Sequence, residues 1–590
     1  MGSDADTESD EGMIAVASLD DLQEDGRAVV QADGQAIALF HHEGHVHAID
    51  NRCPHMGFPL TAGTVEDGVL TCHWHHARFE LEEGDTFDPW ADDVQTFPTA
   101  IEDGDIYVDP DPPRTVPLPT HWRNRLADGL QENIDLVLAK AVIGLDRHAE
   151  GDRGGFDRIV ETAVEFGTKY RAGGWGRGLT TLGCMADLYD HVGPQDRRRA
   201  LYTGVRAVAD DCAGKPPRFR NYAFENRDVS LDRLRSWIED TVAVRDEDGT
   251  ERCLLTAVES ETPTDVADLV VAAATDSRYL NDGHTLDFVN TALETLDHVG
   301  RADHAAPVLA ATVPQLTDAT RAEEQSAWRR PVDVAALCVD ANDRLPDLIA
   351  AGRDRKWERP DDFVETLLGD DPEAIVDALT GAIRAGATRE DLADAVARAA
   401  TRRVAYFATN NEFRDWNTVH HTFSYANAVH RLSARTTTPT LYRACFDGAI
   451  SVYLDRFLNQ PRAPVPDPGG EDRDPEAIRE AFLDCFDRQG AIEEAARLVA
   501  AHFDVGGSAT ALKRVLGRGL LREDATFHTR QHLQAAIQRH EYVDDDRGRR
   551  LALIAAARYM AAHFPTRRQA EETFSIATRL DRGERLHEST

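Results

Sequence analysis

The chain has 590 residues and a formal net charge of −39, from 104 acidic against 65 basic residues. That length supports several domains with ample core. No apolar run approaches the roughly 20 residues of a membrane-spanning helix, and no hydrophobic signal segment follows Met1, so we expect a cytoplasmic protein. A surface of this sign repels nucleic acid and anionic membranes, so we expect neither as a partner.

The acidic residues are spread along the whole chain, and most of the basic residues are arginine. Such a composition is typical of the solvated surface of a protein from a very salty cytoplasm. It predicts a halophilic archaeon as the source. The charge therefore indicates the habitat more than the partner.

Sequence patterns divide the first 120 residues into a tail, a β domain and a linker. Residues 1–12 are mostly Ser, Asp, Glu and Gly, which predicts a disordered acidic tail. From 13 to 110, short alternating runs separated by Asp-Gly and Glu-Gly pairs predict an all-β domain. Residues 111–120 are rich in proline, which predicts a stiff, extended linker.

The remaining sequence predicts α-helix almost to its end, because apolar residues recur at intervals of three and four. A segment rich in Pro, Gly and Asp, 461–475, predicts a surface loop. It divides the helical region into a first part, 121–460, and a second part, 476–590. The expected fold is therefore a small all-β domain followed by a large all-α domain.

The β domain carries a pattern of metal ligands. Cys53-Pro54-His55 is a C-x-H pair and Cys72-His73-Trp74-His75 is a C-x-x-H pair, with 16 residues between His55 and Cys72. Two thiolates and two imidazoles in this order form the ligand set of a Rieske [2Fe–2S] centre. A zinc site uses the same ligand types but usually carries its cysteines as C-x-x-C pairs.

Residues 13–110, one sixth of the chain, resemble the Rieske-type ferredoxins and the ferredoxin-like domains of Rieske oxygenases. The resemblance implies that Cys53 and Cys72 hold one iron of a [2Fe–2S] cluster and that His55 and His75 hold the other. It also implies single-electron transfer, with a reductase or a ferredoxin as the electron donor.

Several positions near the ligands distinguish this chain from other members of the family. The respiratory branch has a disulfide between its two cluster loops, where this chain has Phe58 and Trp74, and a Ser near the position of Ala77. Both absences favour the lower-potential ferredoxin and oxygenase branch, because hydrogen bonds to the sulfurs help to set the potential. The family usually has Gly after the last ligand, where this chain has His76.

The helical region contains a repeat. His284-Thr285 recurs as His421-Thr422 and as His528-Thr529, and Asp190-His191-Val192-Gly193 recurs from Asp297. We infer four helical-hairpin units near 178–211, 284–318, 421–456 and 528–563. Repeated helix pairs stack into an open α-solenoid or close into a toroid, and each pair buries its apolar face on its neighbours.

The recurring histidines His284, His421 and His528 are the candidate catalytic residues of the helical region. We expect them at helix starts, which converge on one rim or cavity if the hairpins close into a ring. Three imidazoles there would bind a second metal, Fe or another divalent ion, and carboxylates are available from Asp282, Asp287 or Asp415. The alternative interpretation is helix capping by the threonines, with the histidines merely packed.

The first unit departs from this pattern, because its equivalent position is Arg177, so three units supply histidine. Over a few residues, the His-Thr helices resemble the all-α questin-oxidase-like proteins, some of which carry out Baeyer–Villiger-type oxygenation. The D-x-x-H-x-x-x-x-H iron motif of the standard Rieske non-haem iron oxygenases does not follow residue 120.

We therefore expect a Rieske oxidoreductase, a monooxygenase outside the standard dioxygenase family. An external reductase or ferredoxin would reduce the cluster, which would feed electrons to a site in the helical domain where O2 and a small organic substrate react. The alternative is a non-enzymatic electron carrier or redox sensor whose helical repeats form a scaffold for a protein partner.

Overall fold

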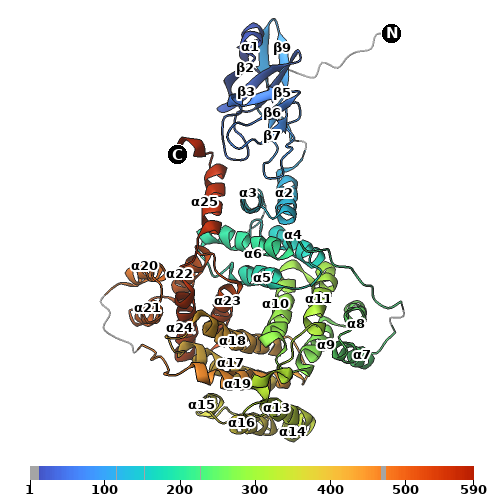
Figure 1. Cartoon of the computed structure of the whole chain (residues 1–590), viewed down its shortest axis with the longest axis vertical. Helices are drawn as coiled ribbons and strands as arrows, with labels where there is room; N and C mark the ends of the chain where they lie inside the picture. The colour runs from blue at the N-terminus through green and yellow to red at the C-terminus, as the bar shows by residue number, and fades with distance from the viewer. Residues whose placement is uncertain are drawn as a thin grey trace. The chain divides into compact units, whose positions relative to one another are not determined.

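The computed structural model describes residues 12–589 except 115, 150, 152, 226–227 and 467–472. The tail expected at 1–12 therefore lies outside the described residues except for Gly12, as does the centre of the loop expected at 461–475. The chain forms two compact units, which are Met1–Gly155 together with Glu572–Thr590, and Phe156–Glu571. Unit 1 thus combines segments from both ends of the sequence (Figure 1). Within the described residues, every helix is too short or too polar to cross a membrane.

The β domain of unit 1 confirms the expected all-β fold. Its strands form three antiparallel sheets in the orders β1-β10-β9, β2-β3-β4-β8 and β5-β6-β7. Two short helices accompany the strands. In chain order the elements are β1 (Ile14–Ser18), α1 (Leu19–Asp25), β2 (Arg27–Ala32), β3 (Gln35–His42), β4 (His45–Asp50), η1 (Leu60–Ala62), β5 (Thr64–Glu66), β6 (Val69–Thr71), β7 (Arg78–Glu80), β8 (Thr96–Phe97), β9 (Thr99–Glu102) and β10 (Asp105–Val108).

Strand β3 separates two hydrophobic cores in this domain. Ile37 and Leu39 pack into one core, whereas Ala38 and Phe40 pack into the other. Successive side chains of a strand point to opposite faces, so a strand that is covered on both sides is apolar at every position. The second core also contains the two motif cysteines, so the cluster loops are anchored in the interior.

Helices from both ends of the chain complete unit 1. They are α2 (Leu118–Glu132), α3 (Asp135–Arg147), the part of α25 (Gln569–Asp581) from Glu572 onward, and η6 (Leu586–Ser589). The first turn of α2 lies within the segment 111–120 that the sequence predicts as a linker. Arg52 of the β domain donates hydrogen bonds to the carbonyls of Leu580 (2.8 Å) and Glu584 (3.0 Å), which fixes the C-terminal segment to the first cluster loop.

Four helical hairpins form the centre of unit 2, in agreement with the four repeat units. They are α5 (Arg177–Leu188) with α6 (Arg197–Cys212), α10 (His284–Val299) with α11 (Arg301–Thr317), α18 (Phe413–Ser433) with α19 (Leu441–Leu454), and α23 (Phe527–Tyr542) with α24 (Asp546–His563). Helix α5 packs against α10 and α23, and α18 packs against the same two helices. The four first helices therefore close into a ring (Figure 1).

The other helices of unit 2 precede, separate or follow these hairpins. They are α4 (Phe156–Lys169), η2 (Pro194–Asp196), α7 (Leu231–Ala243), α8 (Glu247–Ser260), α9 (Pro263–Asp276), η3 (Leu280–Gly283), η4 (Ala322–Glu324), α12 (Ser326–Arg329), α13 (Val334–Asp343), α14 (Leu345–Gly352), α15 (Phe363–Leu367), α16 (Pro372–Arg384), α17 (Arg389–Ala405), η5 (Asp455–Leu458), α20 (Pro475–Phe486), α21 (Ile492–Asp504) and α22 (Ala509–Leu521).

Polar side chains meet on the axis of the ring at both of its ends. At one end, His284 of α10 contacts His528 of the opposite helix α23, with 3.3 Å between their Nε2 atoms. Ten residues further along the same two helices, Gln538 Nε2 donates to Glu294 Oε1 across 3.3 Å. Ten residues rise about 15 Å along a helix, so the two polar layers lie well apart along the axis. The ring thus places the recurring histidines together at one end.

Candidate metal centres

The two cluster loops of unit 1 have the same backbone structure. The amide of Cys53 donates to Phe58 O, and that of Cys72 donates to Ala77 O, both at 2.8 Å. Four residues after each cysteine the backbone is left-handed, with φ of 83° at Gly57 and 64° at His76. The second loop therefore places a histidine where the first loop uses glycine.

The four motif side chains lie close together between these loops. The thiols of Cys53 and Cys72 share a hydrogen bond, which lowers the pKa of Cys72 to about 6 and raises that of Cys53. The rings of His55 and His75 lie 4.8 Å apart, edge to face. His55 Nδ1 is buried and has no hydrogen-bond partner. A buried ring nitrogen normally has a partner, and an iron atom would supply one here. The donor set therefore fits a cluster with two sulfur and two nitrogen ligands.

An aromatic contact joins the loops where the respiratory branch has its disulfide. The rings of Phe58 and Trp74 lie 6.0 Å apart, and His587 from the C-terminal segment contacts both rings. All eight cysteines are free thiols and buried. The C-terminal segment of unit 1 therefore helps to cover the candidate cluster site.

A buried lysine, which no sequence motif predicted, supports the first cluster loop. Lys140 of α3 donates from Nζ to the carbonyls of Pro54 (2.5 Å) and His55 (2.9 Å). Its counter-ion Asp92 lies 3.6 Å away and also accepts a hydrogen bond from Arg125. The available signal was a single lysine within the apolar stretch 137–145 of a helix, where an unpaired charge is costly.

In unit 2, the ring brings His284, His421 and His528 together. The Nε2 atoms of His284 and His421 lie 3.3 Å and 3.2 Å from Nε2 of His528. One ligand atom of each residue lies within 4.8 Å of those of the other two. A metal with M–N bonds of about 2.1 Å separates neighbouring nitrogens by about 3.0 Å in an octahedral site and about 3.4 Å in a tetrahedral site. Two of the three separations thus match those of neighbouring ligands on one metal.

Their protonation state suits metal binding. Burial, then the neighbouring His284, and also Arg177 lower the pKa of His421 to about 2 and that of His528 to about 3. These two imidazoles are therefore neutral near pH 7, which is the form that binds metals. Arg177 sits beside the histidines as expected for the equivalent residue of the first unit.

A carboxylate orients the first of these histidines. His284 Nδ1 donates to Asp287 Oδ2 across 3.2 Å, which orients the ring with Nε2 toward His528. Ser424 donates to the same carboxylate oxygen at 2.9 Å. Of the three carboxylates expected from the sequence, Asp287 thus contacts a histidine, and Asp282 lines a neighbouring cavity with His421. Asp415 instead accepts from the amide of Glu412 at the start of α18.

The recurring threonines do not cap these helices. The residue that precedes the first turn is Gly283 in α10 and Thr526 in α23. His284 and His528 lie in the first turn of their helices, as expected, but α18 begins at Phe413, so His421 lies two turns inside. A capping pair, Glu412 and Asp415, extends this helix beyond the repeat, which the His-Thr pattern alone did not reveal.

Behind the three histidines lies a second group of buried rings. His420 Nδ1 is 3.1 Å from His532 Nδ1, and His532 stacks on Tyr559 with ring centroids 4.1 Å apart. Burial lowers the pKa of both His420 and His532 well below the usual value. The two imidazoles of this group are therefore neutral near pH 7, and the group packs closely behind the three histidines.

Comparison with known proteins identifies the family of the β domain. Residues 12–98 match the family model described as Rieske [2Fe-2S] domain. The ferredoxin component of the alkene monooxygenase system of Xanthobacter autotrophicus Py2 is 34% identical over 100 residues, which is 17% of this chain and 82% of that protein. The 3-phenylpropionate/cinnamic acid dioxygenase ferredoxin subunit of Photorhabdus laumondii is 34% identical over 97 residues, which is 16% of this chain and 91% of that protein.

Among solved structures, the ferredoxin of carbazole 1,9a-dioxygenase from Nocardioides aromaticivorans IC177 is similar. It is 24% identical to this chain, and the match covers 17% of this chain and 98% of that chain with a TM-score of 0.16. None of these three matches covers more than 17% of this chain.

Proposed function

The chain belongs to the Rieske [2Fe–2S] family through its β domain, and we propose that it is an oxidoreductase in which the cluster delivers electrons to a metal bound by His284, His421 and His528. The observation that carries this proposal is the spacing of the three Nε2 atoms. Nε2 of His284 and Nε2 of His421 lie 3.3 Å and 3.2 Å from Nε2 of His528, which are the separations of neighbouring ligands on one cation.

In the β domain, Cys53 and Cys72 would hold one iron and His55 and His75 the other, as the resemblance implied. When bound, this group supplies one-electron transfer. The chain holds the two ligand loops in place through their matching backbone turns and through the contacts of Lys140 with the first loop.

We place this chain with oxygenase systems, because both similar ferredoxins are components of such systems. Insertion of one oxygen atom into a substrate C–H bond consumes O2, two electrons and two protons, and yields a hydroxylated product and water. An external reductase or ferredoxin would supply the electrons one at a time. A covalent link between donor and acceptor raises their effective concentration, which favours delivery within the chain.

Metal analysis of the purified full-length protein tests this proposal. We expect two irons from the cluster and one further transition metal per chain. The double variant His284→Ala/His421→Ala should lose the further metal while its cluster absorption and EPR signals stay unchanged. The control is His191→Ala, which removes a histidine at the opposite end of the ring and should keep all three metals.

The reciprocal variant Cys53→Ser/Cys72→Ser should lose the two cluster irons and keep the further metal. A double histidine variant that retains the two cluster irons and the further metal would contradict the proposed three-histidine site. Two irons and no other metal in the unaltered protein would instead favour the electron carrier with a helical scaffold.

A further inference from the structure

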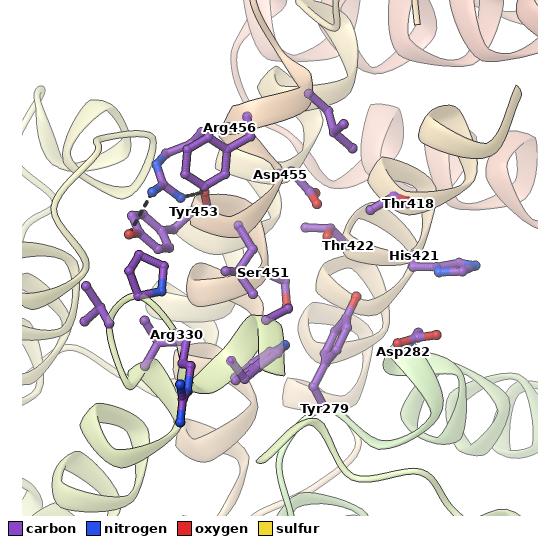
Figure 2. A pocket seen from close by; sticks show the side chains of 18 residues that line it. Tyr279, Asp282, Arg330, Thr418, His421, Thr422, Ser451, Tyr453, Asp455 and Arg456 are labelled. Atoms are coloured by element: carbon purple, nitrogen blue, oxygen red, sulfur yellow. Dashed lines mark hydrogen bonds between the residues drawn. The ribbon is translucent and has the colours of Figure 1, made fainter. Parts of the chain in front are cut away.

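The site formed by His284, His421 and His528 is partly open to solvent. All three side chains are partly exposed. On one flank, His421 borders a cavity of about 500 Å³ that Asp282 also lines (Figure 2). Figure 2 shows the His421 ring directed away from Ser451 in the cavity wall, and its Nε2 lies 3.2 Å from that of His528. Nε2 of His421 thus faces the other histidines and not the cavity wall at Ser451.

Arg177 of α5 lies at the same end of the ring as these histidines. It has the position in the first hairpin that histidine has in the other three. Its guanidinium carbon is 5.8 Å from the centre of the Phe527 ring, and that ring lies 5.4 Å from His284 and 4.7 Å from His528. After burial and the neighbouring histidines, Arg177 also lowers the pKa of both His421 and His528, which places its charge near them. One guanidinium and three imidazoles are thus gathered at one place.

The guanidinium of Arg177 has no counter-ion from the described part of the chain. It is exposed, and among the described residues its side chain forms neither a hydrogen bond nor an ion pair. Asp211, which accepts from an amide at the start of α5, forms its ion pair with Arg171 at 3.0 Å instead. At the opposite end of the ring, Arg431 donates to Glu294 across 2.6 Å. The ring thus pairs an arginine with a carboxylate at one end and leaves an arginine available at the other.

The surroundings of the three histidines favour a negative charge. Burial, other histidines and Arg177 lower the pKa of His421 and of His528, and among the described residues no carboxylate opposes them. Asp287, a carboxylate that contacts the histidines, is 2% exposed and already accepts a hydrogen bond from His284. A divalent cation held by neutral imidazoles would keep its full positive charge. An anionic ligand would offset that charge and the charge of Arg177 together.

Three helix N-termini add to this effect. Helices α5, α10 and α23 begin at Arg177, His284 and Phe527, so their N-termini lie at the histidine end of the ring. The N-terminal amides of a helix and its dipole attract negative charge. This contribution acts in the same direction as the charge of Arg177.

The shape of these groups selects a carboxylate on an apolar body. A guanidinium is planar, and its fork of donors matches the two oxygens of a carboxylate. The partly exposed ring of Phe527 lies next to the guanidinium and to His528, and it offers an apolar surface for the rest of a ligand. A free phosphate has oxygens for Arg177 but no group that packs on Phe527.

We propose that Arg177 binds the carboxylate of an organic acid at the three-histidine site, while the apolar body of that acid packs against Phe527. The inference rests on the proposed oxidoreductase function, because it names the substrate class of that site. Arg177 would hold the molecule by its acidic end and so fix which of its atoms lies beside the histidines. Binding requires no electrons, and Arg177 supplies its charge with or without a metal.

Calorimetric titration of the full-length protein with four probes tests the proposal. The probes are cyclohexanecarboxylate, its uncharged counterpart cyclohexanecarboxamide, acetate and inorganic phosphate. We expect cyclohexanecarboxylate to bind about tenfold more tightly than each of the other three, because it alone has both the charge and the apolar body. Chelation of the further metal should weaken its binding but leave this order unchanged.

Variants of two arginines assign the effect to Arg177. Arg177→Gln should bind the acid and its amide equally, which is a loss of about tenfold for the acid. Arg177→Lys keeps the charge without the fork, so it should retain part of the preference. The control is Arg233→Gln, because Arg233 lies 5.8 Å from the ring of Trp237 in α7, outside the ring of hairpins, and this variant should bind like the unaltered protein. Both arginines are exposed, and melting curves show that the variants are folded.

Equal binding of the acid and its amide, acetate or phosphate that binds as tightly as the acid, or an unchanged affinity in Arg177→Gln would overturn the proposal. An equal loss in Arg233→Gln would also overturn it, because the effect would then belong to the net charge. A preference that disappears on chelation would assign the acid to the metal and remove the role of Arg177. Absence of the further metal with the acid preference intact would remove the oxidoreductase function and leave this binding site in place.

Discussion

At the scale of single residues, the sequence pointed to both groups of candidate ligands but not to their surroundings. The C-x-H and C-x-x-H spacing pointed to Cys53 and Cys72, because metal ligands on tight loops leave a local signature. The recurring His-Thr pairs pointed to His284 and His528, because repeated units place equivalent residues at equivalent positions. Lys140 has no such signature, since only the folded chain shows that it is buried and what it faces.

His76 provides a test at this scale. It has a φ of 64°, where the matching position of the first loop is Gly57. A residue with a Cβ in this conformation costs about 1–2 kcal/mol, whereas glycine costs roughly 0.5–1 kcal/mol through the greater entropy of the unfolded chain. We expect His76→Gly to stabilise unit 1 by about 0.5–1 kcal/mol, measured by denaturant unfolding of the cluster-loaded protein.

The matched control is His73→Gly in the same loop, because His73 is exposed and is not among the residues with a left-handed backbone. This control should lose stability rather than gain it. A His76→Gly protein that is less stable than the unaltered one would show that its imidazole contributes more than the strain costs.

At the scale of elements, regular patterns were predicted well and exceptions to them were not. The strands followed from alternation, and their Asp-Gly and Glu-Gly turns have the left-handed residues that such hairpins need, as at Glu43 and Gly44. The start of α18 was missed, because the repeat was aligned on His421 and not on the capping pair two turns earlier. Helix α3 was predicted, but the contact of its lysine with a loop 85 residues earlier was not.

Helix α3 should also tune the cluster. The Lys140 ammonium is buried against the backbone of the first cluster loop, and a positive charge there stabilises the reduced, more negative state. We expect Lys140→Met to lower the midpoint potential by about 59 mV, which is a tenfold change in the one-electron equilibrium. The measurement is a spectroscopic redox titration of the full-length protein.

Lys169→Met is the control, because Lys169 is an exposed residue of α4 in unit 2. Lys140→Arg keeps the charge and should restore most of the potential. An unchanged potential in a Lys140→Met protein with intact cluster absorption would rule out this electrostatic role.

At the scale of the whole molecule, closure of the helix ring was beyond the reach of sequence patterns. The repeat indicated hairpins that stack, but an open solenoid and a closed ring have the same local signals. The decisive contacts join His284 to His528 and Glu294 to Gln538, each 244 residues apart. Long-range contacts of this kind depend on how every hairpin packs, which no local window of sequence encodes.

The net charge of −39 is a property of the whole chain, and it should make stability depend on salt. Repulsion among the acidic groups destabilises the compact state, and dissolved ions screen it. We expect the melting temperature to rise by about 5–10 °C between 0.1 M and 2 M KCl, which corresponds to a few kcal/mol. Differential scanning calorimetry measures it, and an unchanged or lower melting temperature would contradict the prediction.

The covering of the first cluster loop by the C-terminal segment has a consequence for the order of events during synthesis. Arg52 and Gly57 lie early in the sequence, whereas their contacts at Leu580 and Glu584 are made only after all of unit 2 has been translated. Throughout that time the first cluster loop remains without this cover. The nascent β domain is therefore made long before the C-terminal segment that covers its first cluster loop. During that interval it can receive iron and sulfide while the loop is still uncovered.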